Sequence, residues 1–320
     1  MMENERKMKA AVMHKYGNPD VLKYEEVEIP AVQPDEVLVK VHYSSINPMD
    51  WKVRAGYTKD SIPLKLPAVI GIDVAGTVEK VGAAVKNFKE GDKVFGRADF
   101  TKGGSYAEFT SVKEASIAHA PKRITLREAA GLPVVAGTAW GALFDHAKLK
   151  SGQRILITGA SGGVGTLAVQ LAKNAGAYVI GTTSTENLGM VKGLGADEAI
   201  DYTKEDFSKK VKDVDVVFDT VGGDTLTKAY STLKRGGILV TIAGQPDNEL
   251  ARKYGITVKG GSIHADGKRF TEIAKVVDSG KLKVVIDKEY PLKDIREAHA
   301  YSESRKAKGK IILKVTSSND

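Results

Sequence analysis

Ile155-Leu156-Ile157-Thr158-Gly159-Ala160-Ser161-Gly162-Gly163-Val164-Gly165 is the stretch that decides the fold of this chain. Three β-prone apolar residues run into a glycine-rich turn, and residues 166–173 (TLAVQLAK) then repeat their apolar side chains at helical spacing. A strand, a tight turn and a helix N-terminus direct backbone N–H groups and the positive end of the helix dipole at whatever binds in the turn. The stretch therefore predicts an anion site, and its glycines allow a pyrophosphate to approach the backbone closely.

The turn departs from the dinucleotide pattern G-x-G-x-x-G at one position, where Ala160 replaces the first glycine. Taken alone, such a motif also fits any tight connection between a strand and a helix. A second β-like run at 177–182 follows the helix at the distance that a βαβ unit needs. We therefore expect a dinucleotide site in this turn. Its expected contacts are Gly159, Ser161, Gly162, Gly163 and Val164.

The composition of the 320 residues is that of an ordinary globular protein, with 42% hydrophobic and 28% charged residues. This length allows two domains with ample cores. No apolar run reaches the ~18 residues that a membrane-spanning helix needs, so we expect no membrane partner. The first seven residues include four charged residues and lack the apolar core of a signal peptide. We expect a cytoplasmic protein.

Cysteine content and net charge further limit the reactions and ligands that are possible for this chain. The chain has no cysteine, which excludes disulfides, thiolate catalysis and Cys-ligated zinc. The formal net charge of +8 could favour a phosphate-rich cofactor or nucleic acid. However, the basic residues are spread along the chain and do not alternate with aromatic residues in one run. We favour a generally basic surface, with single-stranded RNA binding at most as a secondary activity.

The two halves of the chain differ in their predicted secondary structure. Residues 9–130 contain short β-like runs separated by glycine and proline, and the period-two pattern at 36–43 places Val37, Val39 and Val41 on one face. This half predicts a compact, barrel-like β domain. Thr125 is a candidate helix N-cap, and from about this residue on, strands and helices alternate. The expected strands are 154–158, 178–182, 198–201, 215–219, 238–242 and 257–262.

Six parallel strands with helical crossovers predict a doubly wound sheet. After residue 262, a helix at 268–278, a strand at 284–287, a helix at 293–304 and a strand at 310–315 are expected to return to the first domain. The domains would then comprise 1–125 with 265–320, and 126–264, with a cleft between them.

Six motifs in this order resemble the zinc-independent quinone oxidoreductases of the medium-chain dehydrogenase/reductase superfamily, over nearly the whole chain. They are S-I-N-P-M-D (45–50), G-I-D-V-A-G (71–76), G-D-K-V-F-G (91–96), A-S-G-G-V-G (160–165), L-G-A-D (194–197) and G-K-I (309–311). The resemblance implies an α/β fold that joins a GroES-like β-barrel catalytic domain to a doubly wound parallel-sheet Rossmann domain.

The resemblance also bears on metal use. Zinc-dependent members have a catalytic Cys at the position of Asn47, and Gly-His-Glu where this chain has Gly71, Ile72 and Asp73. Ile72 cannot bind a metal, and an amide is a poor zinc ligand compared with a thiolate. The six histidines show no paired ligand spacing, and we interpret them as surface or packing residues. They are His14, His42, His119, His146, His264 and His299. We therefore expect no metal site.

Without a Lewis acid, oxidation of a simple alcohol is difficult. Hydride delivery to a quinone or an α,β-unsaturated carbonyl is easier, because the acceptor delocalises the incoming charge onto oxygen. Such a reaction needs orientation and a few hydrogen-bond donors. We therefore predict an NADPH-dependent reductase of quinones or enones. The alternative within enzymes is a reductase of enoyl thioesters or other activated alkenes.

The resemblance implies several site residues in the catalytic domain. Asn47 is expected near the nicotinamide and its ribose, although it could simply form the turn before Pro48. Tyr57 is expected to line the substrate cleft, with packing as the alternative, and Asp50 to orient Lys52 or its neighbours, with a structural ion pair as the alternative. Lys310 is expected to reach the cofactor cleft.

In the other domain, Thr138 is expected to contact the cofactor near the nicotinamide, with a buried helix hydroxyl as the alternative. The second strand ends in Thr182, Thr183 and Ser184, where an NAD-preferring fold would place a carboxylate. Hydroxyl donors there suit a 2′-phosphate. Many relatives carry a lysine at the position of Asn187, so that residue and the neighbouring Glu186 weaken this preference.

The remaining expected cofactor contacts lie where other strands end. Tyr202 is expected beside the 2′-phosphate, with a simple strand-end aromatic residue as the alternative. Ala243, Gly244 and Ile263 are expected at the carboxyl edge of the sheet, beside the nicotinamide. We also expect a homodimer formed through the edge strand at 257–262, because an exposed sixth strand offers unpaired backbone groups.

Overall fold

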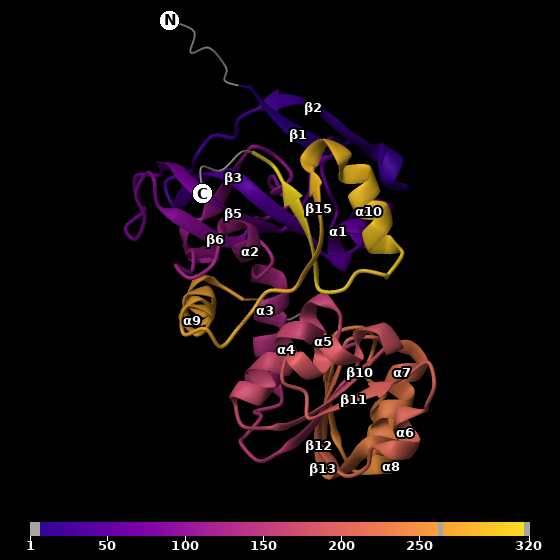
Figure 1. The fold of residues 1–320 in the computed structure, drawn as a ribbon. Coiled ribbons are helices and arrows are strands. Elements are labelled where there is room, and N and C mark those ends of the chain that lie inside the picture. The colour runs from indigo at the N-terminus through magenta and orange to yellow at the C-terminus, as the bar shows by residue number, and fades with distance from the viewer. Residues whose placement is uncertain (1–6, 262–264, 317–320) are drawn as a thin grey trace, which may run out of the picture. The chain divides into compact units, whose positions relative to one another are not determined.

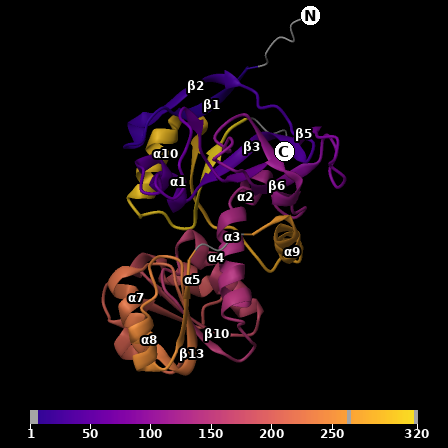
Figure 2. The same cartoon turned by 180° about the vertical axis from the view of Figure 1, so that it is seen from behind.

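The structure is a computed structural model that describes residues 7–261 and 265–316. These residues form two compact units (Figures 1 and 2). The first unit comprises 7–134, 265–280 and 286–316, and the second comprises 135–261 and 281–285.

The boundary after Val134 lies nine residues beyond the one expected from the sequence. Helix α2 (Leu126–Ala129) begins at the predicted cap, where the Thr125 hydroxyl accepts the Glu128 N–H and the Glu128 carboxylate accepts the Thr125 N–H. Leu126 and Ala129 are buried, and α2 contacts strands of the first unit. The start of this helical stretch therefore belongs to the β-rich unit, and α3 (Pro133–Trp140) crosses the boundary.

Most of the regular secondary structure in the first unit is β-strand. Its strands are β1 (Lys7–Met13), β2 (Leu22–Glu28), β3 (Glu36–Ile46), β4 (Ala68–Val69), β5 (Asp73–Val81), β6 (Lys93–Arg97), β7 (Phe109–Lys113), β8 (Ile117–His119), β15 (Ile286–Pro291) and β16 (Lys310–Lys314). Helices α1 (Pro48–Ala55), α9 (Gly267–Asp278) and α10 (Ile295–Glu303) also belong to it.

Strand β3 organises this unit. It pairs with β5 along one edge, and its other edge pairs first with β7 and then with β16. As predicted, Val37, Val39 and Val41 lie on one face and pack in a core with Val74 and Val94. A separate three-stranded sheet has the order β2-β1-β4. The chain therefore returns after the second unit to complete the sheet that β3 organises.

The second unit contains a six-stranded parallel sheet in the order β11-β10-β9-β12-β13-β14. The strands are β9 (Arg154–Ile157), β10 (Tyr178–Thr183), β11 (Glu198–Asp201), β12 (Val214–Asp219), β13 (Leu233–Thr241) and β14 (Thr257–Gly260). Its helices include α4 (Gly163–Asn174), α5 (Leu188–Gly193), α6 (Phe207–Lys210), α7 (Gly223–Ala229) and α8 (Asn248–Tyr254). Helix α3 continues as a π-helical segment, Gly141–His146.

The sheet is doubly wound, because α4 and α5 cover one face and α7 and α8 cover the other (Figures 1 and 2). The predicted fold class is confirmed. The predicted strand at 284–287 begins later, at Ile286, because residues 281–285 belong to the second unit. There the backbone of Lys283 donates to and accepts from the buried side-chain amide of Gln170 on α4.

Candidate active site

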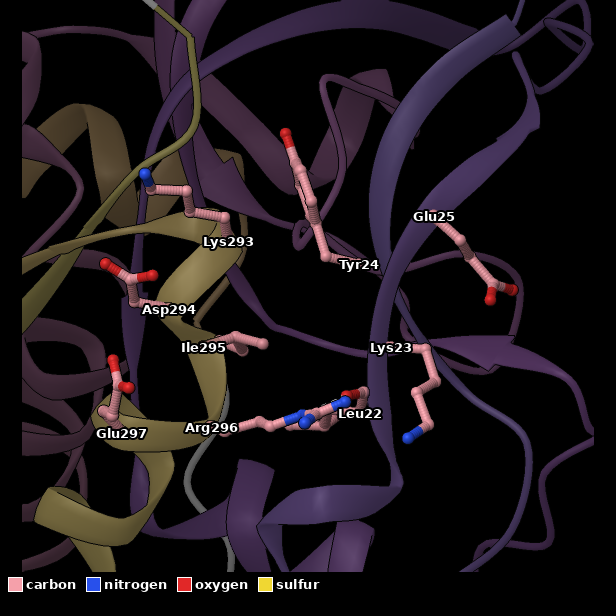
Figure 3. A pocket seen from close by; sticks show the side chains of 9 residues that line it. All are labelled: Leu22, Lys23, Tyr24, Glu25, Lys293, Asp294, Ile295, Arg296 and Glu297. Carbon is pink, nitrogen blue, oxygen red and sulfur yellow. Dashed lines mark hydrogen bonds between the residues drawn. The ribbon is translucent and has the colours of Figure 1, made fainter.

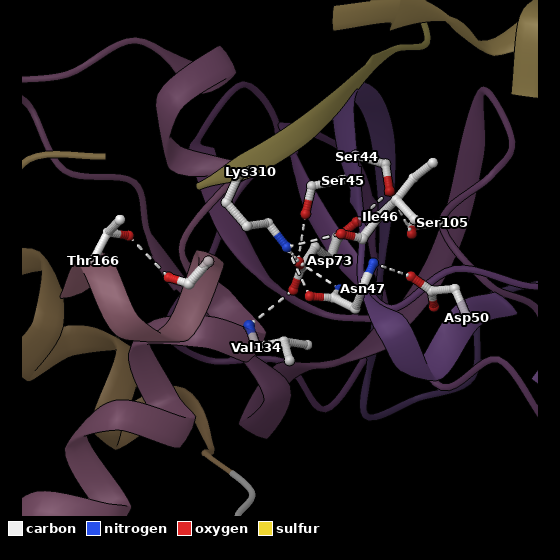
Figure 4. Close-up of polar contacts among 11 residues, drawn as sticks. Ser44, Ser45, Ile46, Asn47, Asp50, Asp73, Ser105, Val134, Thr166 and Lys310 are labelled. Carbon is white, nitrogen blue, oxygen red and sulfur yellow. Dashed lines mark hydrogen bonds and ion pairs between the residues drawn. The ribbon is translucent and has the colours of Figure 1, made fainter. Parts of the chain in front are cut away.

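A buried polar cluster lies in the first unit where the end of β3 meets the starts of β5 and β16. Strand register places Ser45 opposite Asp73 and Ile46 opposite Ile311, so that Lys310 lies beside Asn47. We call Ser45, Asn47, Asp73 and Lys310 the Asp73 cluster. Their side chains point toward one another in Figure 4.

Asp73 is the centre of this cluster and is fully buried. Its Oδ2 accepts hydrogen bonds from the Ser45 hydroxyl, from Asn47 Nδ2 at 2.8 Å and from Lys310 Nζ at 3.3 Å. Its Oδ1 accepts the backbone N–H of Val134 at 2.9 Å. A buried carboxylate requires this many donors, because burial without partners would strongly disfavour its charged form.

The Lys310 ammonium is also fully engaged within the first unit. Besides Asp73, it donates to Asn47 Oδ1 at 2.7 Å and to the Ile46 carbonyl at 3.2 Å, and the residue is only 3% exposed. An ammonium has three N–H donors, and three acceptors surround this one. Lys310 therefore holds Asn47, and its expected contact with the cofactor stays a prediction.

Asn47 is the N-cap of α1 and has its carboxamide fixed at both ends. Its Oδ1 accepts from Lys310 and its Nδ2 donates to Asp73, while its backbone N–H donates to Asp50 Oδ2 at 2.7 Å. Among the hydrogen bonds of the described residues, the carboxamide uses one of its two Nδ2 hydrogens. The second hydrogen is the donor that this residue could offer to a ligand.

Asp50 is buried at the third position of α1 and completes the capping box with Asn47. Burial raises the pKa of Asp50 from 3.8 to about 7, and the nearby charge of Asp73 acts in the same direction, against the Asn47 N–H bond. The sequence predicts that Asp50 orients Lys52 or its neighbours, and the Lys52 ammonium lies over the Trp51 ring, 5.8 Å from its centroid. Asp50 positions Asn47.

Tyr57 follows the end of α1 and is 75% exposed. Its ring meets the ring of Trp51 edge-on at a centroid distance of 6.1 Å. The position of Tyr57 therefore fits both packing against Trp51 and contact with a substrate. Its hydroxyl is accessible to a bound substrate.

A second buried group joins α1 to α10. The Arg54 guanidinium is fully buried and donates to the Gly17 carbonyl at 3.1 Å and to Glu303 at 2.7 Å. It also lies 3.3 Å from Nδ1 of His299. Burial, followed by the charge of Arg54, lowers the pKa of His299 to about 3, so this histidine is neutral. Sequence reasoning missed this group, because Arg54 and His299 are 245 residues apart along the chain.

In the second unit, the glycine turn has the geometry of a phosphate cradle. Gly159 adopts φ +67°, which favours glycine, and a Cβ on Gly165 would lie 2.1 Å from the Gly159 carbonyl oxygen. Ala160, which replaces the first glycine of the motif, is buried against Gly181. Gly162 is the N-cap of α4, and the first-turn amides of that helix have no acceptor within the helix.

Thr182, Thr183, Ser184 and Asn187 form what we call the β10 tip. The Thr182 hydroxyl accepts the Gly159 N–H at 3.3 Å. Thr183 is 1% exposed, and its hydroxyl has no partner among the described residues. Ser184 Oγ accepts from Asn187 Nδ2 at 3.0 Å. The tip therefore contains hydroxyl groups and no carboxylate.

The adjacent acid is already engaged. Asp201 ends β11 opposite Thr183 and accepts hydrogen bonds from the hydroxyls of Thr185 and Thr203 and from the Thr203 N–H at 3.0 Å. The bond from Thr185, followed by that from Thr203, lowers the pKa of Asp201. Tyr202, next in the chain, is 60% exposed, and its N–H donates to the Thr183 carbonyl.

Asp219 holds the carboxyl edge of the sheet together. This buried carboxylate accepts the hydroxyls of Thr158 and Thr241, each at 2.7 Å, and the N–H of Gly222. Ala243 and Gly244, two expected cofactor contacts, follow β13 and are exposed. Thr138 is buried in α3, and Ile263 lies outside the described residues. Sequence reasoning did not select Asp219.

These features fit a phosphorylated dinucleotide. A Cβ at Gly159 or Gly165 would clash with neighbouring protein atoms, so these glycines keep the turn between β9 and α4 tight, and a helix N-terminus of this kind binds pyrophosphate. The unpartnered hydroxyl of Thr183 lies where the adenosine ribose is bound in this fold.

Metal binding and membrane insertion find no support in the described part of the chain. Among residues 7–261 and 265–316, no group of three or more His, Cys, Asp or Glu side chains could hold a metal ion. No helix in the part of the chain that the structure describes is long and apolar enough to cross a membrane.

A surface groove of about 530 Å³ lies elsewhere in the first unit, between residues of β2 and the start of α10 (Figure 3). Its walls carry acidic and basic side chains in equal number, and the Arg296 side chain closes onto the Leu22 carbonyl at 2.8 Å. It contains none of the predicted site residues.

Two family models match the chain. The alcohol dehydrogenase GroES-like domain matches residues 33–122, and the zinc-binding dehydrogenase model matches residues 194–313. The chain is 39% identical to 2-methylene-furan-3-one reductase of Solanum lycopersicum, an alignment that covers 96% of this chain and 79% of that protein. It is 38% identical to the chloroplastic NADPH-dependent alkenal/one oxidoreductase of Arabidopsis thaliana, and this alignment covers 96% of this chain and 80% of that protein.

Solved structures agree with these matches. The quinone oxidoreductase of Coxiella burnetii is 33% identical, with a TM-score of 0.91 over 97% of this chain and 100% of that one. The Escherichia coli quinone oxidoreductase, solved in complex with NADPH, is 29% identical, with a TM-score of 0.88 over 96% of this chain and 100% of that one.

Proposed function

Because the chain belongs to the quinone oxidoreductase family of the medium-chain dehydrogenase/reductase superfamily, we propose that it uses NADPH to reduce quinones or α,β-unsaturated carbonyls. The observation that carries the proposal is the fixed carboxamide of Asn47, which is held by Lys310 and Asp73 with one N–H unused. An oriented donor of this kind stabilises negative charge that develops on a carbonyl oxygen.

NADPH supplies the hydride when it is bound. The second unit would hold its pyrophosphate at the turn of Gly159 to Val164 and its 2′-phosphate at the β10 tip. Thr138, Ala243 and Gly244 would contact the nicotinamide half, as the resemblance implies.

Asn47 and Tyr57 would bind the oxygen of the acceptor. The carboxamide needs no reorganisation, because both of its ends are fixed by buried partners. Tyr57 lies on the surface of the first unit, so its hydroxyl can adapt to acceptors of different size. After hydride transfer, the reduced acceptor would take its final proton from water.

The first experiment is a screen of NADPH consumption against quinones, enals, enones and an enoyl thioester, with and without a metal chelator. We expect turnover of a quinone or an enone that the chelator does not change, because the zinc-ligand positions hold Asn47 and Ile72. Turnover of the thioester alone, or activity abolished by chelation, would contradict the proposal.

Replacement of the donor tests the role of Asn47. Asn47→Ala should lower kcat by about 10²–10³-fold, as for other oriented donors to a developing oxyanion. Asn87→Ala is the matched control, because the Asn87 carboxamide also bonds a carboxylate of the first unit but is exposed. A kcat within threefold of the unaltered enzyme in Asn47→Ala, with folding confirmed by circular dichroism, would refute the assignment.

We also propose a homodimer through β14, which is the edge strand of the parallel sheet. A monomer mass by light scattering at micromolar concentration would refute it. The cytoplasmic location stays a prediction that microscopy of the tagged protein would check, and relatives are named as chloroplastic or mitochondrial.

A further inference from the structure

We propose that Asn187 determines the preference for a 2′-phosphate by fixing the hydroxyl of Ser184, an inference that rests on the proposed binding of NADPH. Asn187 occupies the position where the resemblance implies a lysine, so it supplies no charge. The structure gives this residue a different part in the site, as a positioning residue that acts through its neighbour.

Asn187 and Ser184 are joined by two hydrogen bonds. The Asn187 carboxamide is buried, and its Nδ2 donates to Ser184 Oγ at 3.0 Å. The Asn187 backbone N–H donates to the Ser184 carbonyl, also at 3.0 Å. These bonds close the short helical turn Thr185–Asn187 directly after β10. The Ser184 hydroxyl therefore has a fixed place at the β10 tip.

The direction of the Asn187–Ser184 bond decides what Ser184 can bind. A hydroxyl has a single proton, and an oxygen that already accepts from Asn187 keeps that proton for another acceptor. The adjacent Thr183 hydroxyl is buried without a partner among the described residues. Within the described ranges, two successive residues thus carry hydroxyl protons that lack a protein acceptor, and a phosphate group supplies only acceptors.

The same arrangement is unfavourable for a dinucleotide without the 2′-phosphate. A ribose 2′-hydroxyl is best bound by a carboxylate, and the nearest acid in strand register, Asp201, is occupied by Thr185 and Thr203. Hydrogen bonds to charged groups are stronger than those to neutral groups. Uncharged donors therefore favour the 2′-phosphate, although less than a lysine would.

The experiment measures binding of adenosine 2′,5′-bisphosphate and of 5′-AMP to the full chain by titration calorimetry, without turnover. Asn187→Ala should weaken the bisphosphate about tenfold and leave 5′-AMP unchanged, because one charge-assisted hydrogen bond is misdirected. Ser184→Ala should have the same effect, and the double variant should be no weaker than either single variant.

Ser231→Ala is the matched control. The Ser231 hydroxyl bonds the Lys228 carbonyl just before β13 begins at Leu233, whereas Ser184 follows the end of β10. In a parallel sheet, these positions lie at opposite edges. The control should bind both ligands as the unaltered chain does.

Asn187→Asp separates a positioning role from a purely structural one, since the side chain keeps its size. An aspartate would accept the Ser184 proton, so the preference for the bisphosphate should disappear while 5′-AMP still binds. Equal weakening of both ligands in Asn187→Ala, or full preference in Asn187→Asp, would overturn the inference alone. Failure of the unaltered chain to bind either ligand would overturn the proposed function, and this inference with it.

Discussion

The Asp73 cluster and the β10 tip are both buried and polar, but they differ in how their hydrogen-bonding groups are used. In the cluster, Asp73 accepts four donors and Lys310 donates to three acceptors. At the tip, the Thr183 hydroxyl has no partner among the described residues. Charged groups must be satisfied within the protein, whereas a hydroxyl can be left for a ligand at a lower cost than a charge.

This difference separates stability from binding. Substitutions in the cluster should change the free energy of unfolding strongly, because they leave a charge buried without its partner. Substitutions at the tip should change ligand affinity and have little effect on unfolding. Three experiments on variants test whether the two regions differ in this way.

The largest expected effect follows from Lys310→Met. This change leaves Asp73 buried without its counter-charge and should lower the free energy of unfolding by about 3–5 kcal/mol, measured by urea denaturation. The double variant Asp73→Asn with Lys310→Met should recover most of this loss, because it has no buried charge at either position. A double variant no more stable than Lys310→Met would show that packing, not charge, dominates the cluster.

A second effect, which accumulates over a range of pH, concerns Asp50, beside the cluster. Its pKa is about 7 in the folded protein and 3.8 ordinarily, so the folded state retains a proton that the unfolded chain releases between these values. The free energy of unfolding should therefore fall by up to about 1.4 kcal/mol per pH unit from about pH 4 to 7, relative to Asp50→Asn. Parallel pH profiles for the two proteins would contradict the raised pKa.

The smallest effect on stability is expected from Thr183→Val at the β10 tip. Removal of an unpartnered buried hydroxyl should change the free energy of unfolding by no more than about 1 kcal/mol, toward higher stability. Thr158→Val is the matched control, because it removes a hydroxyl that donates to buried Asp219 and should cost about 1–3 kcal/mol. Equal losses in the two variants would remove the distinction between the regions.

Local patterns in the sequence predicted the fold well. The alternation at Val37 to Val41 and the turn at Gly159 to Gly165 each depend on neighbours along the chain, and both formed as expected. The Asp73 cluster could be predicted only in part, because Lys310 is 237 residues from Asp73 and strand register alone brings them together. The resemblance pointed to Asn47, but nothing local indicated which atoms hold it.

Asn187 shows a different kind of error. We interpreted it as a missing lysine, although Ser184 lies three residues earlier, a spacing at which side chains in a helical turn can meet. The separation of these two residues was therefore a usable signal. Arg54 and His299 carried no such signal, because their contact depends on the packing of α1 against α10.

Residues 281–285 have a consequence for recombination between relatives. The chain passes between units after Val134, between 261 and 265, after Gly280 and after Val285, so a gene segment that ends near residue 264 does not encode the whole second unit. The side-chain amide of Gln170 is buried, and both its Nε2 and its Oε1 bond the backbone of Lys283. Without Lys283, both atoms would lose that partner. A chimaera that exchanges cofactor-binding units must therefore inherit two separate pieces of the gene from the same parent.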